Sequence, residues 1–157
     1  MENIQLTKNF SLSEFVQSAT AARLGIDNTP NEAELENIKK TAEYLQIVRD
    51  ELNTPIRISS GYRGEKLNKA VKGSSTSAHR YGSAVDIHAI GFTSTQLALK
   101  IEELIKAKKI PCDQLILEYP GTLNTWVHLG FKHNSPMREQ YLTAKRVNGK
   151  TQYVNGI

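Results

Sequence analysis

The sequence has a single cysteine, Cys112, so an internal disulfide is excluded. This cysteine lies in the apolar stretch IPCDQLIL, where we expect a buried small side chain rather than a nucleophile. No apolar run approaches the roughly 20 residues that a membrane-spanning helix needs. The first ten residues, MENIQLTKNF, lack the basic start and apolar segment of a secretory signal. We therefore expect neither a disulfide scaffold nor a membrane partner.

Internal repeats, low-complexity stretches and an obvious linker are also missing, so residues 1–157 are expected to form a single domain. Hydrophobic residues make up 39% and charged residues 23% of the chain, a composition typical of a globular protein with a core. The formal net charge of +4 suits solubility or an anionic partner. A nucleic-acid binder is not expected, because no basic stripe with interleaved aromatic residues is present.

Hydrophobic periodicity predicts a mixture of helices and strands. Apolar residues spaced three or four apart indicate a long helix that starts at Pro30 and ends before Asn53-Thr54-Pro55. Strict alternation of strands and helices is missing, so we expect an α+β fold with a mainly antiparallel sheet and flanking helices. The other expected elements are a helix capped at Ser11 with Glu14 at capping-box spacing, a helix capped at Thr93 or Ser94, strands over 56–59, 83–90, 114–119 and 125–131, and a C-terminal hairpin of 141–147 and 150–154 that turns at Asn148-Gly149.

Three side chains form a candidate metal site. His79 lies in a Gly/Ser-rich loop, Asp86 follows seven positions later on an expected strand, and His128 lies on a later strand. Imidazole nitrogen and carboxylate oxygen both bind zinc, and three protein ligands with one open position are typical of a catalytic site. The spacing alone is weak evidence, because His88 shares the strand face of Asp86 and is a rival ligand. His133 is expected to be exposed to solvent.

The same stretch resembles a known family. SGYRGEKLNKAVKGSSTSAHRYGSAVDI is similar to the signature of zinc D-Ala-D-Ala carboxypeptidases and related phage endolysin peptidases. The matching residues are Ser60-Gly61-Tyr62-Arg63, Leu67-Asn68, Gly73-Ser74, Ser77 to Asp86 and Trp126-Val127-His128. The likeness covers about residues 9–131, which leaves 138–157 as a C-terminal hairpin tail. It implies a Hedgehog/D-Ala-D-Ala peptidase-like fold.

The resemblance also implies roles for individual residues. His79, Asp86 and His128 correspond to the ligands of one Zn²⁺ ion. Arg63 corresponds to an active-site arginine that binds or polarises the substrate, as a guanidinium fork suits a carboxylate or an oxyanion. Ser77 matches a serine before the metal loop, for which three roles are open: orienting a metal ligand, contacting the substrate, or a purely structural role in a turn.

The general base departs from the pattern of several relatives. These relatives carry a catalytic Glu three residues before the last His, whereas Thr125 occupies that position here. Glu118 is the expected substitute, because a hairpin of the strands 114–119 and 125–131 would place it on the face of His128. Asp113 and His88 are the fallback candidates, and Gln114 points the same way as Glu118 and is expected to line the site.

The resemblance leads to a functional expectation: a zinc-dependent, lysin-like peptidase that hydrolyses peptidoglycan bonds involving D-amino acids, as a D,D-carboxypeptidase or an endopeptidase. The alternative is a catalytically inactive zinc-binding module of the same fold, which acts in wall binding or in a virion. Peptidoglycan stem peptides are the expected partners of a monomeric protein. Such a chain is expected to be made in the bacterial cytoplasm and to act at the cell wall after release or as part of a phage particle.

Overall fold

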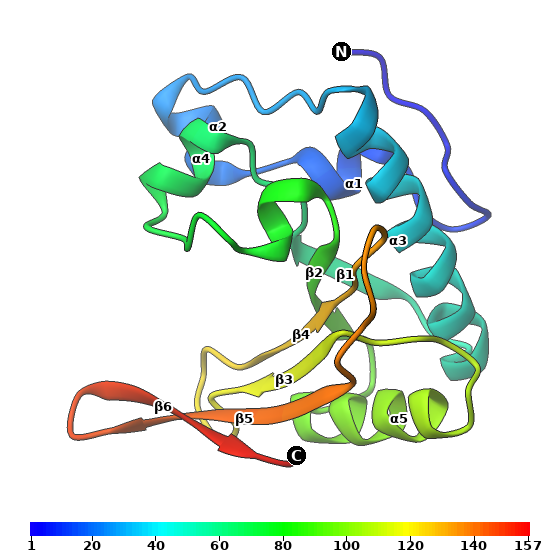
Figure 1. Ribbon diagram of the computed structural model, residues 1–157, viewed down its shortest axis with the longest axis vertical. Helices are drawn as coiled ribbons and strands as arrows, with labels where there is room; N and C mark the ends of the chain where they lie inside the picture. Colours follow the sequence, from blue (N-terminus) through cyan, green and yellow to red (C-terminus); the bar gives the residue numbers. More distant parts are fainter.

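The computed structural model describes all 157 residues and has a central six-stranded sheet (Figure 1). The strand order is β1-β2-β4-β3-β5-β6, and every neighbouring pair is antiparallel except β3 and β5, which are parallel. The expected α+β fold with a mainly antiparallel sheet is therefore confirmed. The strands are β1 (Ile56–Ser60), β2 (Ala84–Ala89), β3 (Gln114–Glu118), β4 (Trp126–Gly130), β5 (Gln140–Val147) and β6 (Lys150–Asn155).

The long helix that the sequence places from Pro30 begins at Glu32, and the helix expected after Thr93 or Ser94 begins at Ser94. Thr93 and Asn31 each cap a helix through a capping box, in which the side chain and the backbone of two residues satisfy each other's orphan groups. Ser11 and Glu14 form the expected box at the first helix, but the segment that follows divides into two short helices. The helices are α1 (Leu12–Val16), α2 (Ala19–Leu24), α3 (Glu32–Leu52), α4 (Glu65–Ala70), the 3-10 helix η1 (Ala78–Tyr81) and α5 (Ser94–Lys106).

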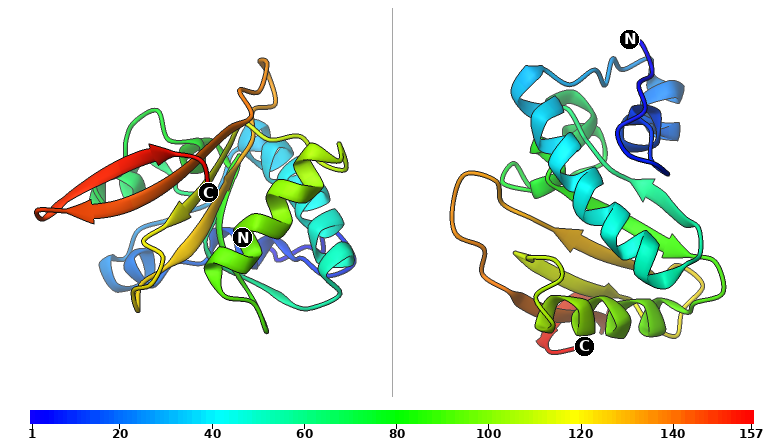
Figure 2. Two further views of the ribbon diagram at one scale, coloured as in Figure 1. Left: turned by 90° about the horizontal axis from the view of Figure 1, so that it is seen from below. Right: turned by 90° about the vertical axis from the view of Figure 1, so that its right-hand side faces the viewer.

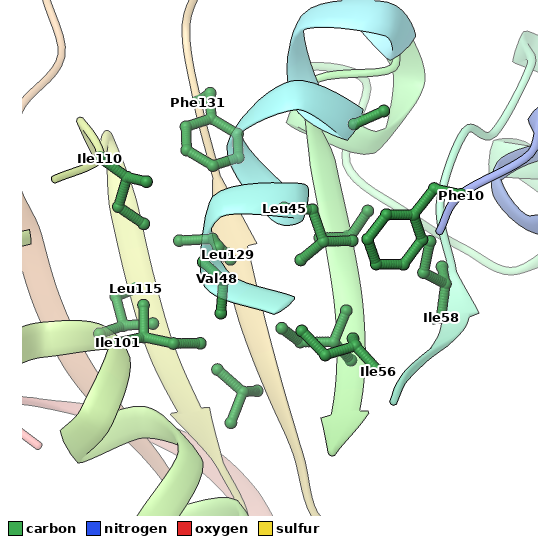
Figure 3. Close-up of a cluster of buried hydrophobic side chains, with 14 of the residues drawn as sticks. Phe10, Leu45, Val48, Ile56, Ile58, Ile101, Ile110, Leu115, Leu129 and Phe131 are labelled. Atoms are coloured by element: carbon green, nitrogen blue, oxygen red, sulfur yellow. The ribbon is translucent and has the colours of Figure 1, made fainter. Parts of the chain in front are cut away.

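The main hydrophobic core lies between one face of the sheet and the helices α3 and α5. Leu45 and Val48 of α3 and Ile101 of α5 meet Leu115 of β3 and Leu129 of β4 there (Figure 3). All five side chains are completely buried. Successive residues of a strand point to opposite faces of the sheet. Packing of the core face therefore determines which side chains of the same strands lie on the opposite face.

The C-terminal hairpin of β5 and β6 projects from the edge of the sheet (Figure 2). Its turn falls at Asn148-Gly149, both with positive φ, as the sequence predicts. Every residue of β6 is exposed. None of the helices has both the length and the apolar character needed to cross a membrane.

Candidate metal centre and cleft

The face of the sheet opposite the core holds the three candidate ligands together. Asp86 on β2 lies directly opposite His128 on β4, so their side chains share a face. His79 comes from η1, which precedes β2 and contacts it. The Oδ1 atom of Asp86 lies 3.2 Å from His79 Nε2 and 3.1 Å from His128 Nδ1. The structure thus gathers the three residues proposed from the sequence, and not His88.

A backbone carbonyl fixes the orientation of the His79 ring. Its Nδ1 donates a hydrogen bond of 2.7 Å to the carbonyl of Gly61. Gly61 packs so closely on helix α1 that an added Cβ would lie 2.5 Å from the carbonyl oxygen of Phe15. The Ser-Gly-Tyr-Arg motif therefore needs its glycine for a close backbone approach. Donation from Nδ1 leaves the lone pair of Nε2 directed at Asp86, which is the usual arrangement of a metal-binding histidine.

This donor set fits a divalent cation. With Nδ1 as donor, the neutral His79 ring and the carboxylate face each other as two electron-pair donors, an arrangement that a shared proton or a cation must bridge. All three ligand atoms lie within 4.8 Å of one another. Burial alone would raise the pKa of Asp86, but when shared protons occupy the gaps to His79 and His128, the charges and hydrogen bonds of these rings outweigh burial and lower this pKa. Asp86 thus stays ionised, as a metal ligand must.

A buried ionic network holds η1 in place. Glu34 of α3 is 7% exposed, accepts a 3.0 Å hydrogen bond from the hydroxyl of Tyr62 and pairs with Arg80 of η1. Burial and the bond to Glu34 raise the pKa of Tyr62 to about 12, so the phenol stays a donor. Gly82 ends η1 at φ +79°, and a Cβ there would lie 2.7 Å from Ile38. This left-handed turn returns the chain to β2.

Arg63 and Ser77 lie beside the ligands. The backbone N–H of Arg63 donates a 2.9 Å bond to the carbonyl of His79, and its guanidinium lies 3.5 Å from the Ser77 hydroxyl. The buried Nε of Arg63 has no partner within the protein. Burial lowers the pKa of Arg63, while the charge of Asp86 opposes the shift. A half-buried guanidinium with an unused donor suits an anionic substrate group. Ser77 also caps η1, by accepting a hydrogen bond of 3.3 Å from the N–H of His79.

Glu118 and Gln114 line the same cleft from β3. Ile116 between them lies opposite His128, so both flanking side chains share its face. Burial raises the pKa of Glu118, and the charge of His128 opposes this effect. Position 125 offers no carboxylate: the Thr125 hydroxyl donates a 2.7 Å bond to the backbone carbonyl of Glu118. Glu118 is therefore the carboxylate of the cleft that is free of a strong ion pair.

The fallback bases are placed less well. His88 lies on β2 opposite Arg57 and does not line the cleft. Asp113 lines the cleft, but both of its oxygens accept hydrogen bonds from the guanidinium of Arg138. Burial would raise the pKa of Asp113, and the bonds from Arg138 lower it below its ordinary value. Neither residue is arranged as a proton acceptor for a group at the metal centre.

The structure also tests the burial predicted for His133 and for Cys112. The expectation of an exposed His133 is wrong: its ring is half-buried and stacks near Tyr44 and Phe131, with Nε2 3.3 Å from the Thr41 hydroxyl. Local sequence missed this because its partners lie far away in the chain. Cys112 is buried, as expected, and burial with nearby negative charges raises the pKa of its thiol to about 12.

The cleft has a volume of about 800 Å³ and includes residues that the sequence did not identify as part of the site. The candidate metal ligands lie between an end with Trp126 and Tyr153 and an end with Lys132 and Arg138. The sequence could have identified Glu34 as a capping residue, because Asn31 and Glu34 have capping-box spacing. Its pairing with Arg80 depends on the tertiary fold and has no signal in the local sequence. No local signal identified Tyr153.

Comparisons with known proteins agree with this geometry. A search of curated proteins finds no match. The sequence model of the peptidase M15 family matches residues 8–129, which is more than half of the chain and contains every residue of the candidate centre. The members of this family are metal-dependent peptidases, and the His-Asp-His cluster suits that requirement. This chain belongs to the peptidase M15 family.

Proposed function

We propose that the protein is a zinc-dependent peptidase that hydrolyses peptidoglycan peptide bonds involving D-amino acids. One observation carries the proposal: His79, Asp86 and His128 converge in a cleft that also holds the free carboxylate of Glu118. Two imidazoles and one carboxylate form a donor set that suits zinc and leaves a fourth position open. The resemblance of the Ser60–Asp86 stretch to D-Ala-D-Ala carboxypeptidases and phage endolysin peptidases supports the choice of substrate.

The residues of the cleft divide the work of hydrolysis. The chemistry that zinc supplies when bound is Lewis acidity, which makes a water molecule nucleophilic near neutral pH. Glu118 accepts the proton of that water and passes it to the leaving amine, a role for which burial has moved its pKa in the right direction. Arg63 faces the developing oxyanion or a substrate carboxylate with its unused donor. Ser77 and Gln114 line the route of the peptide.

The setting of this reaction is also a proposal. The partners are peptidoglycan stem peptides, and the protein reaches the wall after release from the bacterial cytoplasm or as part of a phage particle. The basis is the resemblance to short phage and prophage peptidases. Carboxypeptidase and endopeptidase action are distinguished by the products, because the first releases single amino acids and the second releases peptides.

The test is hydrolysis of purified muropeptides by the full-length protein, followed by mass spectrometry. We expect one zinc per chain, new amino or carboxyl ends in the products, and loss of turnover with chelator that zinc restores. The matched control is Glu118→Gln, which keeps the metal ligands. Bound zinc without hydrolysis of any muropeptide would instead favour the inactive zinc-binding module. Equal turnover with and without chelator contradicts the zinc mechanism.

A further inference from the structure

The C-terminal hairpin reaches the cleft although it lies outside the residues 8–129 that match the family. Strand β5 joins the sheet beside β3 in parallel, and β6 pairs with β5 (Figure 1). Contacts that do not involve Tyr153, the residue of the hairpin that lines the cleft, hold the hairpin on the rest of the protein. The hydroxyl of Tyr119, which follows β3, lies 2.6 Å from the Thr151 hydroxyl of β6, and β5 pairs with β3 along the length of β3. Within the hairpin, the Thr143 hydroxyl donates a 2.7 Å bond to the carbonyl of Gly156. These contacts give the hairpin a defined position on the sheet.

Strand register places Tyr153 on the face of the catalytic carboxylate. Trp126, Glu118, Ala144 and Tyr153 lie opposite one another on the consecutive strands β4, β3, β5 and β6. Cross-strand partners share a face, so this row presents two aromatic rings with a carboxylate and a small side chain between them. Tyr153 lines the same cleft as Glu118. Burial, followed by the negative charge of Glu118, raises the pKa of Tyr153, which reflects their proximity.

Packing does not explain an aromatic residue at this position. Tyr153 is 56% exposed and belongs to neither hydrophobic cluster of the protein. An exposed aromatic ring in a cleft is a common feature of ligand-binding surfaces, because it offers a large apolar area at low cost in conformational entropy. The ring is therefore available for a ligand rather than for the core.

The two ends of the cleft differ in chemistry. Trp126, Ile116 and Tyr153 line the part of the cleft that holds Glu118, whereas Lys132 and Arg138 lie toward the other end of β3. An end with three apolar side chains suits an uncharged, non-polar group of the substrate. The opposite end suits polar or anionic groups.

From this arrangement, we infer that Tyr153, with Trp126 and Ile116, forms a subsite for a non-polar side chain next to the bond that is cleaved. The C-terminal hairpin thus supplies a specificity-determining residue that the family-matched segment does not contain. This inference rests on the proposed peptidase function. Tyr153 acts through the face of its ring, so its hydroxyl is dispensable.

The test compares Tyr153→Thr, Tyr153→Phe and the control Val154→Ala in the full-length protein. Thr suits an exposed strand, so the first variant is expected to fold. Val154 follows on the same strand and points to the other face. With a muropeptide that the wild type hydrolyses, we expect Tyr153→Thr to raise KM about 10-fold with kcat within about 2-fold. Tyr153→Phe and Val154→Ala are expected to match the wild type.

A binding measurement separates this inference from the proposed function. Trp126 is the only tryptophan, so its fluorescence reports occupation of the cleft without turnover. Titration with the same muropeptide is expected to show about 10-fold weaker binding by Tyr153→Thr. Wild-type binding without hydrolysis, together with weaker binding by Tyr153→Thr, would remove the peptidase function and leave Tyr153 as part of a ligand-binding subsite. An unchanged KM and an unchanged affinity in Tyr153→Thr would overturn the subsite and leave the peptidase. Absence of both binding and turnover in the wild type overturns both.

Discussion

On β4, Val127 and Leu129 point into the core while His128 between them points into the cleft, and β2 shows the same difference between Val85 and Ile87 on one face and Asp86 on the other. The core face depends on volume and close packing with α3 and α5. The cleft face depends on the position and charge of a few polar groups. Because side chains alternate along a strand, neighbouring residues can be changed one at a time. Substitutions on one face should change metal binding and turnover, and those on the other should change stability.

The largest expected effect is that of His128→Ala. Removal of one of three ligands should abolish stoichiometric zinc binding and reduce turnover by more than the 10–100-fold that is typical for loss of an outer-shell partner. The fold should persist, because the ligand face packs few core side chains. Zinc content by elemental analysis and muropeptide hydrolysis measure these outcomes. His88→Ala is the matched control, since His88 lies on the face of Asp86 but outside the cleft. Retained zinc in His128→Ala would contradict the assignment.

The next effect is that of Glu118→Gln. Loss of a general base typically reduces kcat by about 10²–10⁴-fold, and the three ligands should still hold zinc. In Glu118→Gln, the decrease of kcat/KM toward acid pH should also disappear. In the wild type, kcat/KM is expected to fall as the pH drops through a pKa that burial has raised above the ordinary value of a Glu. Near-normal turnover in Glu118→Gln would assign the proton transfer to another group.

Glu118→Gln should also make the metal-free protein more stable. The pKa of Glu118 is higher in the folded than in the unfolded chain, so the folded state holds its proton more tightly. The stabilisation that Glu118 adds to the free energy of unfolding is fully present below its pKa in the unfolded chain. It is lost as the pH rises through its pKa in the folded chain. At neutral pH the buried charge therefore destabilises the protein, and its replacement should raise Tm. An equal Tm across pH 4–8 in both proteins would contradict this account.

Glu34→Gln tests whether a residue of α3, the helix that packs on the core face, holds the segment that carries the ligand His79. Glu34 belongs to α3 but pairs with Arg80 of the segment that carries His79. An amide keeps the shape and the helix cap but leaves the guanidinium without its counter-charge. We expect about 10-fold weaker zinc binding, measured by competition with a chromophoric chelator, and kcat of the zinc-loaded enzyme near the wild-type value. The control is Glu36→Gln, because Glu36 forms only a surface pair with Lys39.

The sequence predicts which side chains share a face of the sheet where this depends on local strand patterns. It misses the placements that depend on pairing between distant segments. Alternation in β2 places Asp86 opposite the core, and the hairpin of β3 and β4 brings Glu118 to the face of His128. Both conclusions need only strand period and a short turn. The parallel pairing of β3 with β5 has no local signal, so the position of Tyr153 beside Glu118 was not foreseen. His133 was assigned to the surface for the same reason, because Thr41 and Tyr44 are distant in sequence.

The smallest expected effect on catalysis is that of Leu129→Ala, although it is the residue next to His128. Leu129 is completely buried between the sheet and the helices. Truncation of a buried Leu to Ala typically costs about 2–5 kcal/mol, through lost transfer free energy and a cavity. Denaturant unfolding should show this loss, while zinc stoichiometry and kcat per folded molecule should stay near the wild type. A large fall in kcat with only a small fall in stability would mean that the backbone of β4 transmits core packing to the metal ligand, and that the two faces are not independent.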